Sequence, residues 1–292
     1  MAQPLALLAD IGGTNSRFAL AKNGALLPDT IWHTPNNAYP SFEAALARYL
    51  TQRETPDTAC IAAAGPVQDN TIQLTNHPWL IDTTRLPFAK AHLLNDLQAM
   101  GYALATFSAP TGPRLVLNIG TGLNAAVLRK AHGLWSAPAA ELGYAHLPLL
   151  GTTENRILSQ CARRHGAPVM EAVLSGASLP HLHHALTGQN ITAADITSNW
   201  HEETLKLYLK VLGCYIGDLV LGALPYGGIW LAGSLGRAIF RHLDHGAFRT
   251  SFETRGAYTP LMQSFAFHIL EDEAAALTGA ALYLSQGQTA PA

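Results

Sequence analysis

Apolar residues in this chain follow two alternating patterns. Short continuous runs of strand length, each ending at a polar residue or a glycine, alternate with longer segments in which apolar residues recur at helical spacing. This alternation is typical of α/β folds, in which helices cover a buried sheet. Buried strands are predicted over residues 5–9, 60–64, 91–94, 115–119 and 229–232. Helices are predicted over residues 41–53, 97–104, 200–224 and 271–284.

One stretch of the chain occurs twice in altered form. Residues 7–27 align without a gap on residues 115–135, and Asp10 falls on Asn118. Each copy reads as a strand, a turn containing glycine and a second strand, and Asn-Gly at 23–24, near the end of the first copy, favours a hairpin there. Two readings stay open: chance similarity between glycine-rich hairpins, or two like-folded lobes that each offer a phosphate-sized loop.

The two turns of this repeat are candidate phosphate sites. Glycine lacks a Cβ and leaves successive backbone N–H groups uncovered, and such groups form a concavity that binds anions. Neither turn has the spacing of a dinucleotide fingerprint or a P-loop, and the first is followed by a strand instead of a helix. A plain hairpin would carry the same glycines, but two such turns together favour phosphate. The candidate residues are Asp10, Gly12, Gly13, Thr14 and Asn15 in the first turn and Gly120, Thr121 and Gly122 in the second.

Isolated acidic residues are the candidates for chemistry. Asp10, at the tip of a buried strand, is suited to be an outer ligand of a magnesium ion that is held mainly by nucleotide phosphates. Asn95 and Asp96 lie at a strand-to-helix junction, and two roles fit them equally well. They can be a helix N-cap followed by an acid in the first turn, or Asp96 can be a proton acceptor that the helix N-terminus keeps ionised. Glu141 and Glu171, each among small apolar residues, are suited to accept hydrogen bonds from the hydroxyls of a neutral polyol.

Composition narrows the class of protein. The 292 residues are 48% hydrophobic and 13% charged, which excludes an intrinsically disordered chain, and the net charge of −2 makes nucleic acid an unexpected partner. No apolar run reaches the ~20 residues of a membrane span and the opening residues lack the basic stretch of a signal peptide, so we expect a cytoplasmic protein without membrane association. The three cysteines form no CxxC pair, and His181, His183 and His184 lack a carboxylate partner in the sequence, so neither a disulfide framework nor a metal cluster is favoured.

Eight sequence motifs follow one another along the chain: LLADIGGTNSRFAL (7–20), LTNHPW (74–79), LLNDLQA (93–99), NIGTGLNAAVL (118–128), AELGYAHL (140–147), MEAVLSGASL (170–179), GGIWLAGSL (227–235) and ALTGAALYL (276–284). In this order they resemble the bacterial glucokinase family, of the actin and hexokinase superfold. The cysteine cluster that marks the zinc-containing repressor and kinase group is absent from the sequence. The resemblance is therefore to the zinc-free glucokinases.

The resemblance implies a two-lobed α/β fold of the actin/hexokinase-like (ribonuclease H-like) type with an interlobe cleft. Residues 1–106, joined by the C-terminal helix 275–292, would form the small lobe, and residues 107–274 the large lobe. ATP and Mg2+ would bind with the phosphates at the two glycine turns, and Asp96 would act as general base on the 6-hydroxyl of glucose, giving glucose 6-phosphate. The resemblance further implies that the sugar is bound by Asn76, Asn95, Glu141, Tyr144 and Glu171, and the adenosine side by the turn at Gly233 and Ser234.

One motif departs from the family pattern. Where the family reads Glu-Gly-Gly-His, this chain has Tyr144 at the end of the motif, so a longer and bulkier hydrogen-bonding group replaces a histidine that contacts the sugar. Asn124, where a small glycine is common, is expected to crowd the second phosphate turn. We therefore keep two alternatives beside glucose phosphorylation: a kinase of another hexose or an amino sugar, and a sugar-sensing module without catalysis. The resemblance also implies a homodimer that acts on a small-molecule sugar.

Overall fold

The computed structural model describes residues 5–51, 53–75 and 77–287. The chain forms two compact units and passes between them more than once. Unit 1 comprises Met1–Ser108, Leu128–Ala139 and Asp272–Ala292, and unit 2 comprises Ala109–Val127 and Ala140–Glu271. The sequence predicted a boundary after residue 106 and a return of the C-terminal helix alone, so the membership of residues 128–139 in unit 1 was not foreseen.

Unit 1 is built on a five-stranded sheet. Its strands are β1 (Leu5–Ile11), β2 (Asn15–Lys22), β3 (Ala25–Pro35), β4 (Thr58–Ala63) and β8 (Lys90–Asn95), in the order β3-β2-β1-β4-β8. β1 runs antiparallel to β2 and parallel to β4, and β4 runs parallel to β8. The carboxyl ends of β1, β4 and β8 therefore lie at one edge of the sheet, where ligands bind in many open α/β sheets.

Local sequence explains how this sheet begins. The turn between β2 and β3 lies at Asn23 and Gly24, as predicted, with φ angles of 58° and 73° that suit a two-residue hairpin. The helix α1 (Phe42–Leu50) starts where predicted, because the Ser41 side chain accepts a hydrogen bond from the Ala44 N–H. Its buried Phe42 and Tyr49 stack on Phe18 of β2, which joins the helix to the sheet.

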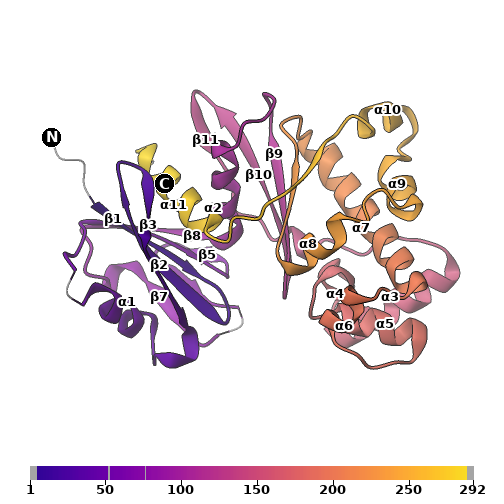
Figure 1. Ribbon diagram of the computed structural model, residues 1–292, viewed down its shortest axis with the longest axis horizontal. Coiled ribbons are helices and arrows are strands. Elements are labelled where there is room, and N and C mark those ends of the chain that lie inside the picture. Colours follow the sequence, from indigo (N-terminus) through magenta and orange to yellow (C-terminus); the bar gives the residue numbers. More distant parts are fainter. Residues whose placement is uncertain (1–4, 52, 76, 288–292) are drawn as a thin grey trace. The chain divides into compact units, whose positions relative to one another are not determined.

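Two helices of unit 1 pack together although they lie far apart in the chain. α2 (Asp96–Ala103) follows β8 directly, and α11 (Ala275–Ser285) returns from the C-terminal region to lie beside it (Figure 1). α11 is buried around most of its circumference, which explains its near-uniform apolar sequence. Gly279 permits the close approach, because a Cβ there would collide with the backbone oxygen of Ala99 in α2. A small antiparallel sheet completes the unit: β5 (Val67–Gln68), β6 (Thr71–Gln73) and β7 (Leu80–Asp82).

A second five-stranded sheet repeats the strand order of the first. Its strands are β9 (Arg114–Ile119), β10 (Leu123–Ala131), β11 (Leu134–Ser136), β12 (Ile229–Ala232) and β13 (Phe267–Ile269), in the order β11-β10-β9-β12-β13. β9, β12 and β13 are parallel, as β1, β4 and β8 are in the first sheet. This match supports like-folded units as the origin of the repeat. β10 crosses the unit boundary at residue 127, and the Trp135 N–H beyond it donates to Gln286 Oε1 at 2.6 Å, which ties residues 128–139 to unit 1.

Unit 2 is rich in helices. The long helix α7 (Glu202–Ala223) was predicted; it is buried along one side and ends before Pro225, with Leu224 in the left-handed region at φ 47°. Within the described residues, every helix is either too short or too polar to span a bilayer. The other helices of unit 2 are α3 (Thr152–His165), α4 (Glu171–Leu174), α5 (Leu179–Thr187), α6 (Ala193–Ser198), α8 (Ser234–Phe240), α9 (Gly246–Glu253) and α10 (Thr259–Met262).

Candidate functional site

The first glycine turn leaves β1 at the carboxyl edge of the unit 1 sheet. Ile11, Ala63 and Asn95 pair across this edge, so the turn after β1 and the junction after β8 lie at the same end of the sheet. The Gly12 N–H donates to the backbone oxygen of Asn15 at 2.9 Å, which closes the turn into a compact hairpin. The predicted phosphate turn and the predicted Asn-Asp pair therefore belong to one edge.

Asp10 forms an ion pair inside the sheet. It is the register partner of Arg17 on β2, and the Arg17 Nη1 group donates to Asp10 Oδ2 at 3.1 Å. The Asp10 side chain is only 13% exposed, and this removal from water raises the pKa of its carboxyl above the ordinary value, although Arg17 acts in the opposite direction. Arg17 also lies 3.8 Å from Glu273, just before α11.

Asn36 fixes the first turn and was not predicted from the sequence. Its side-chain amide donates to the backbone oxygen of Gly12 at 2.8 Å, and its backbone N–H donates to the oxygen of Thr14 at 2.8 Å. Its Oδ1 accepts a 2.6 Å hydrogen bond from the Ser16 hydroxyl. Because Asn36 is buried and contacts both sides of the turn, it holds the loop in a defined shape. No periodicity marks this residue, since its role comes from contacts across the β2–β3 hairpin.

Asn95 and Asp96 start α2 at the same edge. Asn95 is the N-cap: its Oδ1 accepts from the Leu97 N–H at 2.9 Å, and its own backbone N–H donates to Gln98 Oε1 at 3.3 Å, which completes a capping box. The Asn95 amide also donates to the backbone oxygen of Gly65 at 3.1 Å. The capping role considered for this pair is thus present. It places the half-buried Asp96 side chain in the first turn of a helix, where the backbone N–H groups stabilise a negative charge.

The second glycine turn lies in unit 2 between β9 and β10. The Gly120 N–H donates to the oxygen of Gly122 at 3.1 Å, which closes a short turn like the first one. The segment after α4 packs on it: the N–H of Gly176 donates to the Gly120 oxygen at 2.7 Å, and the N–H of Ala177 donates to the Thr121 oxygen at 3.2 Å. A Cβ on Gly176 would lie 2.6 Å from the backbone oxygen of Gly120, so glycine is required for this close approach.

Glu171 joins the second turn to the predicted sugar-binding acids. It is the first residue of α4, and its Oε2 accepts a 2.8 Å hydrogen bond from the Leu123 N–H, directly after the turn. A Cβ on Gly122 would lie 3.0 Å from the same oxygen. Two residues 48 positions apart are therefore in direct contact, and the carboxylate is fixed at the edge of the turn.

Glu141 lies near Glu171, and Asn124 positions it. The Asn124 amide donates to the Ala140 oxygen at 2.8 Å and to Glu141 Oε2 at 3.2 Å, while its Oδ1 accepts from the Leu142 N–H at 2.9 Å. The Asn124 side chain is thus engaged with the segment that carries Glu141, a role that differs from the crowding of the turn expected from the sequence. Desolvation, and secondarily the negative charge of Glu171, raise the pKa of Glu141.

Tyr144 lies beside a histidine that the sequence did not single out. Its side chain is 50% exposed, and its ring meets that of His165 edge to face at a centroid distance of 6.1 Å. His165, the last residue of α3, also places Nε2 at 3.5 Å from Glu171 Oε1. Desolvation, followed by the charges of Glu171 and Glu141, raises the pKa of Tyr144. The structure therefore brings Glu141, Tyr144, Glu171 and the second turn together, with His165 as an added member.

The third glycine turn lies at the end of β12. Gly233 has φ 80°, and a Cβ there would come within 2.5 Å of Asn118 Oδ1 and of the Ile119 oxygen. Ser234 follows as the first residue of α8. Because Ala232 pairs with Asn118, this turn lies at the carboxyl edge of the unit 2 sheet, next to the strand that leads into the second turn. Gly233 is thus a position where a side chain is excluded by close packing.

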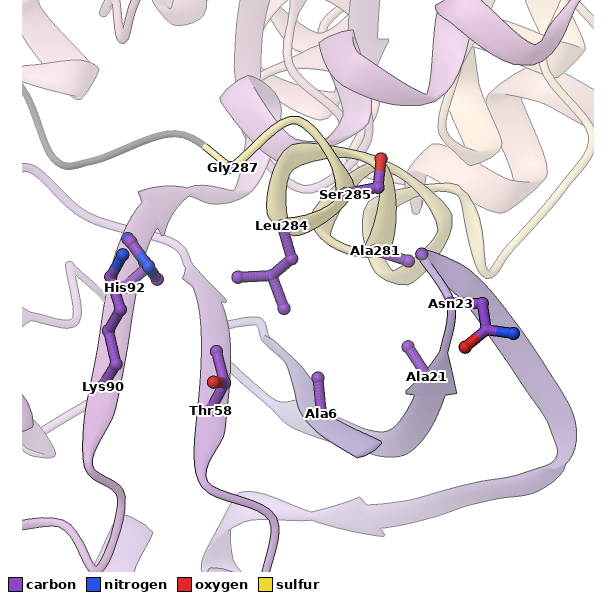
Figure 2. A pocket seen from close by; sticks show the side chains of 11 residues that line it. Ala6, Ala21, Asn23, Thr58, Lys90, His92, Ala281, Leu284, Ser285 and Gly287 are labelled. Carbon is purple, nitrogen blue, oxygen red and sulfur yellow. The ribbon is translucent and has the colours of Figure 1, made fainter. Parts of the chain in front are cut away.

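A cavity in unit 1 lies at the other edge of its sheet. It is lined by residues at the amino ends of the parallel strands, including Ala6, Thr58 and Lys90, and by Leu284 and Ser285 near the end of α11 (Figure 2). Asp10 and Asn95 occupy the carboxyl ends of the same strands, so the cavity and the predicted phosphate turn are at opposite edges. This hollow is therefore separate from the candidate site.

Two further predictions from the sequence concern Asn76 and a magnesium ion. Asn76, predicted to bind the sugar, lies outside the described residues. The described part of the chain contains no group of three or more His, Cys, Asp or Glu side chains arranged to hold a metal ion. For a magnesium ion held mainly by nucleotide phosphates, Asp10 fits the role of an outer ligand, with its Oδ2 held by Arg17 at 3.1 Å.

Comparison with known proteins matches most of the chain. A family model described as Glucokinase matches residues 7–287. The glucokinase of Stenotrophomonas maltophilia (strain R551-3) is 30% identical, with 98% of this chain and 96% of the relative covered, and that of Caulobacter sp. (strain K31) is 29% identical, with 96% and 95% covered. Among solved structures, a glucokinase from an Antarctic psychrotroph superposes with a TM-score of 0.78 at 25% identity, covering 97% of this chain and 99% of that one. The predicted α/β class of the actin/hexokinase type is confirmed.

Proposed function

This chain belongs to the glucokinase family, and on that premise we propose that Asp96 removes the proton from the 6-hydroxyl of glucose as that oxygen attacks the γ-phosphorus of ATP. The chain is an enzyme that phosphorylates glucose with ATP. The identity of the base and of the attacking hydroxyl is the proposal. The bond from the γ-phosphorus to the bridging oxygen of ADP breaks as the new bond to the sugar oxygen forms, and the hydroxyl proton passes to the Asp96 carboxylate.

The observation that carries this proposal is the position of Asp96 at the start of α2. A general base must be ionised before the reaction, and the start of α2 stabilises a carboxylate there, because the Leu97 N–H donates to Asp96 Oδ1 at 2.9 Å. The Asn95 capping box and the packing of α11 on α2 fix the helix, so the carboxylate is held in place before substrate binds. Phosphoryl transfer depends mainly on positioning and charge stabilisation, which such a fixed acid supplies.

The two glycine turns are proposed to bind the phosphates of the nucleotide. Each turn closes on a single backbone hydrogen bond and is held by a neighbouring segment, Asn36 in unit 1 and Gly176 in unit 2. A turn of fixed shape presents its N–H groups to an anion without reorganisation. Bound Mg2+ would neutralise phosphate charge, with Asp10 as its outer partner. Gly233 and Ser234 would lie on the adenosine side.

The sugar is proposed to bind at the acidic residues. Glu141 and Glu171 offer carboxylate oxygens to hydroxyl donors, and the Asn124 and Leu123 contacts fix both groups before binding. Tyr144, Asn95 and Asn76 complete the predicted set. The family resemblance implies a homodimer, and the sequence features described above imply a cytoplasmic location; light scattering on the purified protein tests the assembly.

The test is the Asp96→Asn variant. Removing the base should lower kcat by about 10²–10⁴-fold, the usual contribution of a general base, while KM for glucose changes within several-fold because the amide keeps the size of the carboxylate. The measurement is ADP release with glucose and Mg-ATP, and D82N, at a partly exposed acid of the same unit, is the control. Near-normal turnover of D96N would show that another group takes the proton.

A second candidate is phosphorylation of a different hexose or an amino sugar. Tyr144 favours it, because its half-exposed ring stands where the family motif ends in histidine and so alters the space beside Glu171 and Glu141. A panel of sugars with Mg-ATP and detection of ADP ranks the two candidates. Glucose should give the highest kcat/KM, a better substrate among the others would favour the second candidate, and sugar binding without ADP release would indicate a sensing module.

A further inference from the structure

His165 is placed against the proposed sugar-binding groups from a separate element. It is the last residue of α3, and Gly166 ends that helix in the left-handed conformation at φ 93°. This abrupt end directs the chain toward α4, where Glu171 begins the next helix. The His165 imidazole then lies with Nε2 at 3.5 Å from Glu171 Oε1 and its ring edge to face with Tyr144.

The surroundings of the imidazole favour one tautomer. Nδ1 of His165 is buried and has no hydrogen-bond partner among the described residues, whereas Nε2 faces a carboxylate. A hydrogen on Nδ1 would be buried without an acceptor, which is costly. A neutral ring with its hydrogen on Nε2 avoids that cost and directs a donor at Glu171.

Glu171 would then be held through both of its oxygens. The Leu123 N–H donates to Oε2 at 2.8 Å, and His165 faces Oε1. Each carboxylate oxygen accepts more than one hydrogen bond, so capacity is left for sugar hydroxyls. Without a contact at Oε1 the carboxylate could rotate about its bond to the side chain, since Leu123 restrains one oxygen only.

We propose that His165 is a positioning residue for the sugar: it orients the Glu171 carboxylate, and through its ring contact the Tyr144 side chain, for hydroxyl recognition. This inference rests on the proposed function of Glu171 and Tyr144 as sugar-binding groups. It adds the carboxyl end of α3, where His165 lies, to the elements that form the sugar site. The expected consequence is an effect on sugar affinity that leaves the phosphoryl-transfer step and the nucleotide largely unaffected.

The kinetic test compares three variants. H165L introduces an apolar side chain of similar bulk and removes the donor 3.5 Å from Glu171 Oε1, so KM for glucose should rise about tenfold, the scale of an interaction with a charged group, while kcat and KM for ATP stay near wild type. H165Q retains an N–H donor and should recover most of the affinity. R163L, at an exposed position in the same last turn of α3, is the matched control and should leave KM for glucose unchanged.

A spectroscopic measurement covers the case in which H165L fails to fold. In the wild-type protein, the NMR chemical shifts of the His165 imidazole nitrogens should indicate the Nε2–H tautomer. In E171Q, the chemical shift of Nε2 should change. An Nδ1–H tautomer, or a wild-type KM for glucose in H165L, would overturn the inference. Failure of the proposed function looks different, because the wild-type protein would then release no ADP with glucose.

Discussion

At the scale of single residues, Asp10 shows how a proposed functional group is retained at an energetic cost. Its carboxylate lies in the sheet with 13% of its side chain exposed, and burial outweighs the Arg17 ion pair so that its pKa is raised. A raised pKa means that the folded state holds the proton more tightly than the unfolded state. The ionised form, which is the form proposed to act near an Mg2+-bound phosphate, therefore destabilises the fold at neutral pH.

We expect Asp10→Asn to separate activity from stability. The turnover with Mg-ATP and glucose should fall about 10- to 100-fold, in the range for loss of an outer-shell partner. The free energy of unfolding at pH 7 should equal or exceed that of wild type, because the burial cost of the charge is removed and the partly exposed Arg17 keeps Glu273 as a neighbour. Below the ordinary value of 3.8 both states of wild type are protonated, so the difference should vanish there and grow as pH rises.

Urea unfolding of both proteins between pH 4 and pH 7 measures this difference. The control is D82N, because hydrogen bonds from Thr84 lower the pKa of Asp82 and its ionised form is favourable in the folded state. A D10N protein that is less stable than wild type at pH 7, by an amount that grows with pH, would show that the Arg17 pair outweighs the burial cost.

Residue types alone nominated part of the candidate site and missed other members of it. Asp96 and the glycines became candidates because a chain with little charge makes isolated acids and paired glycine turns conspicuous. Asn36, Asn124 and His165 were missed or assigned another role, because their contacts join segments distant in the chain. No spacing rule in a single sequence encodes such contacts.

At the scale of elements, strands and helices with strong patterns were predictable and short or exposed ones were not. The strand β4 and the helix α7 carry continuous burial patterns that periodicity detects. β3 was missed because most of its side chains are partly exposed and its apolar and polar positions do not alternate cleanly. The short helix α4, which carries Glu171, has four residues and offers too few positions for any period.

The contact between α11 and α2 gives a prediction about Gly279. A methyl group there would collide with the Ala99 backbone oxygen, so Gly279→Ala should push α11 from α2 and lower the free energy of unfolding by about 1–3 kcal/mol, the usual cost of overpacking. Because α2 positions Asp96, kcat should fall as well, with a smaller change in KM for glucose. Chemical unfolding and steady-state assays measure both effects.

The control for this helix contact is Gly222→Ala in α7. A Cβ at that exposed position would meet nothing within 4 Å, so alanine should stabilise the helix by about 0.5–1 kcal/mol through its higher helix propensity. Opposite signs for the two substitutions would separate the packing effect from the propensity effect. If G279A were also stabilising, the close packing of α11 on α2 would be wrong.

At the scale of the whole molecule, the repeat in the sequence corresponds to two sheets of the same strand order. The gap-free alignment of 7–27 with 115–135 covers β1–β2 and β9–β10, which occupy equivalent places in the two sheets. The alignment did not indicate that residues 128–139 join unit 1, because that membership depends on contacts such as Trp135 with Gln286. Local similarity therefore located equivalent strands, while long-range contacts decided which unit they stabilise.

The equivalence of the two turns predicts a shared response to nucleotide. A non-hydrolysable ATP analogue with Mg2+ should slow amide hydrogen exchange at residues 12–15 in unit 1 and at 120–123 in unit 2, because phosphate oxygens would accept hydrogen bonds from both turns. The turns at 23–24 and 132–133 are built-in controls. They too contain glycine, but they lie at the opposite ends of β2 and β10 and should exchange at unchanged rates. Protection of only one of the two proposed turns would mean that one unit alone holds the triphosphate, and the second turn would then be a structural hairpin.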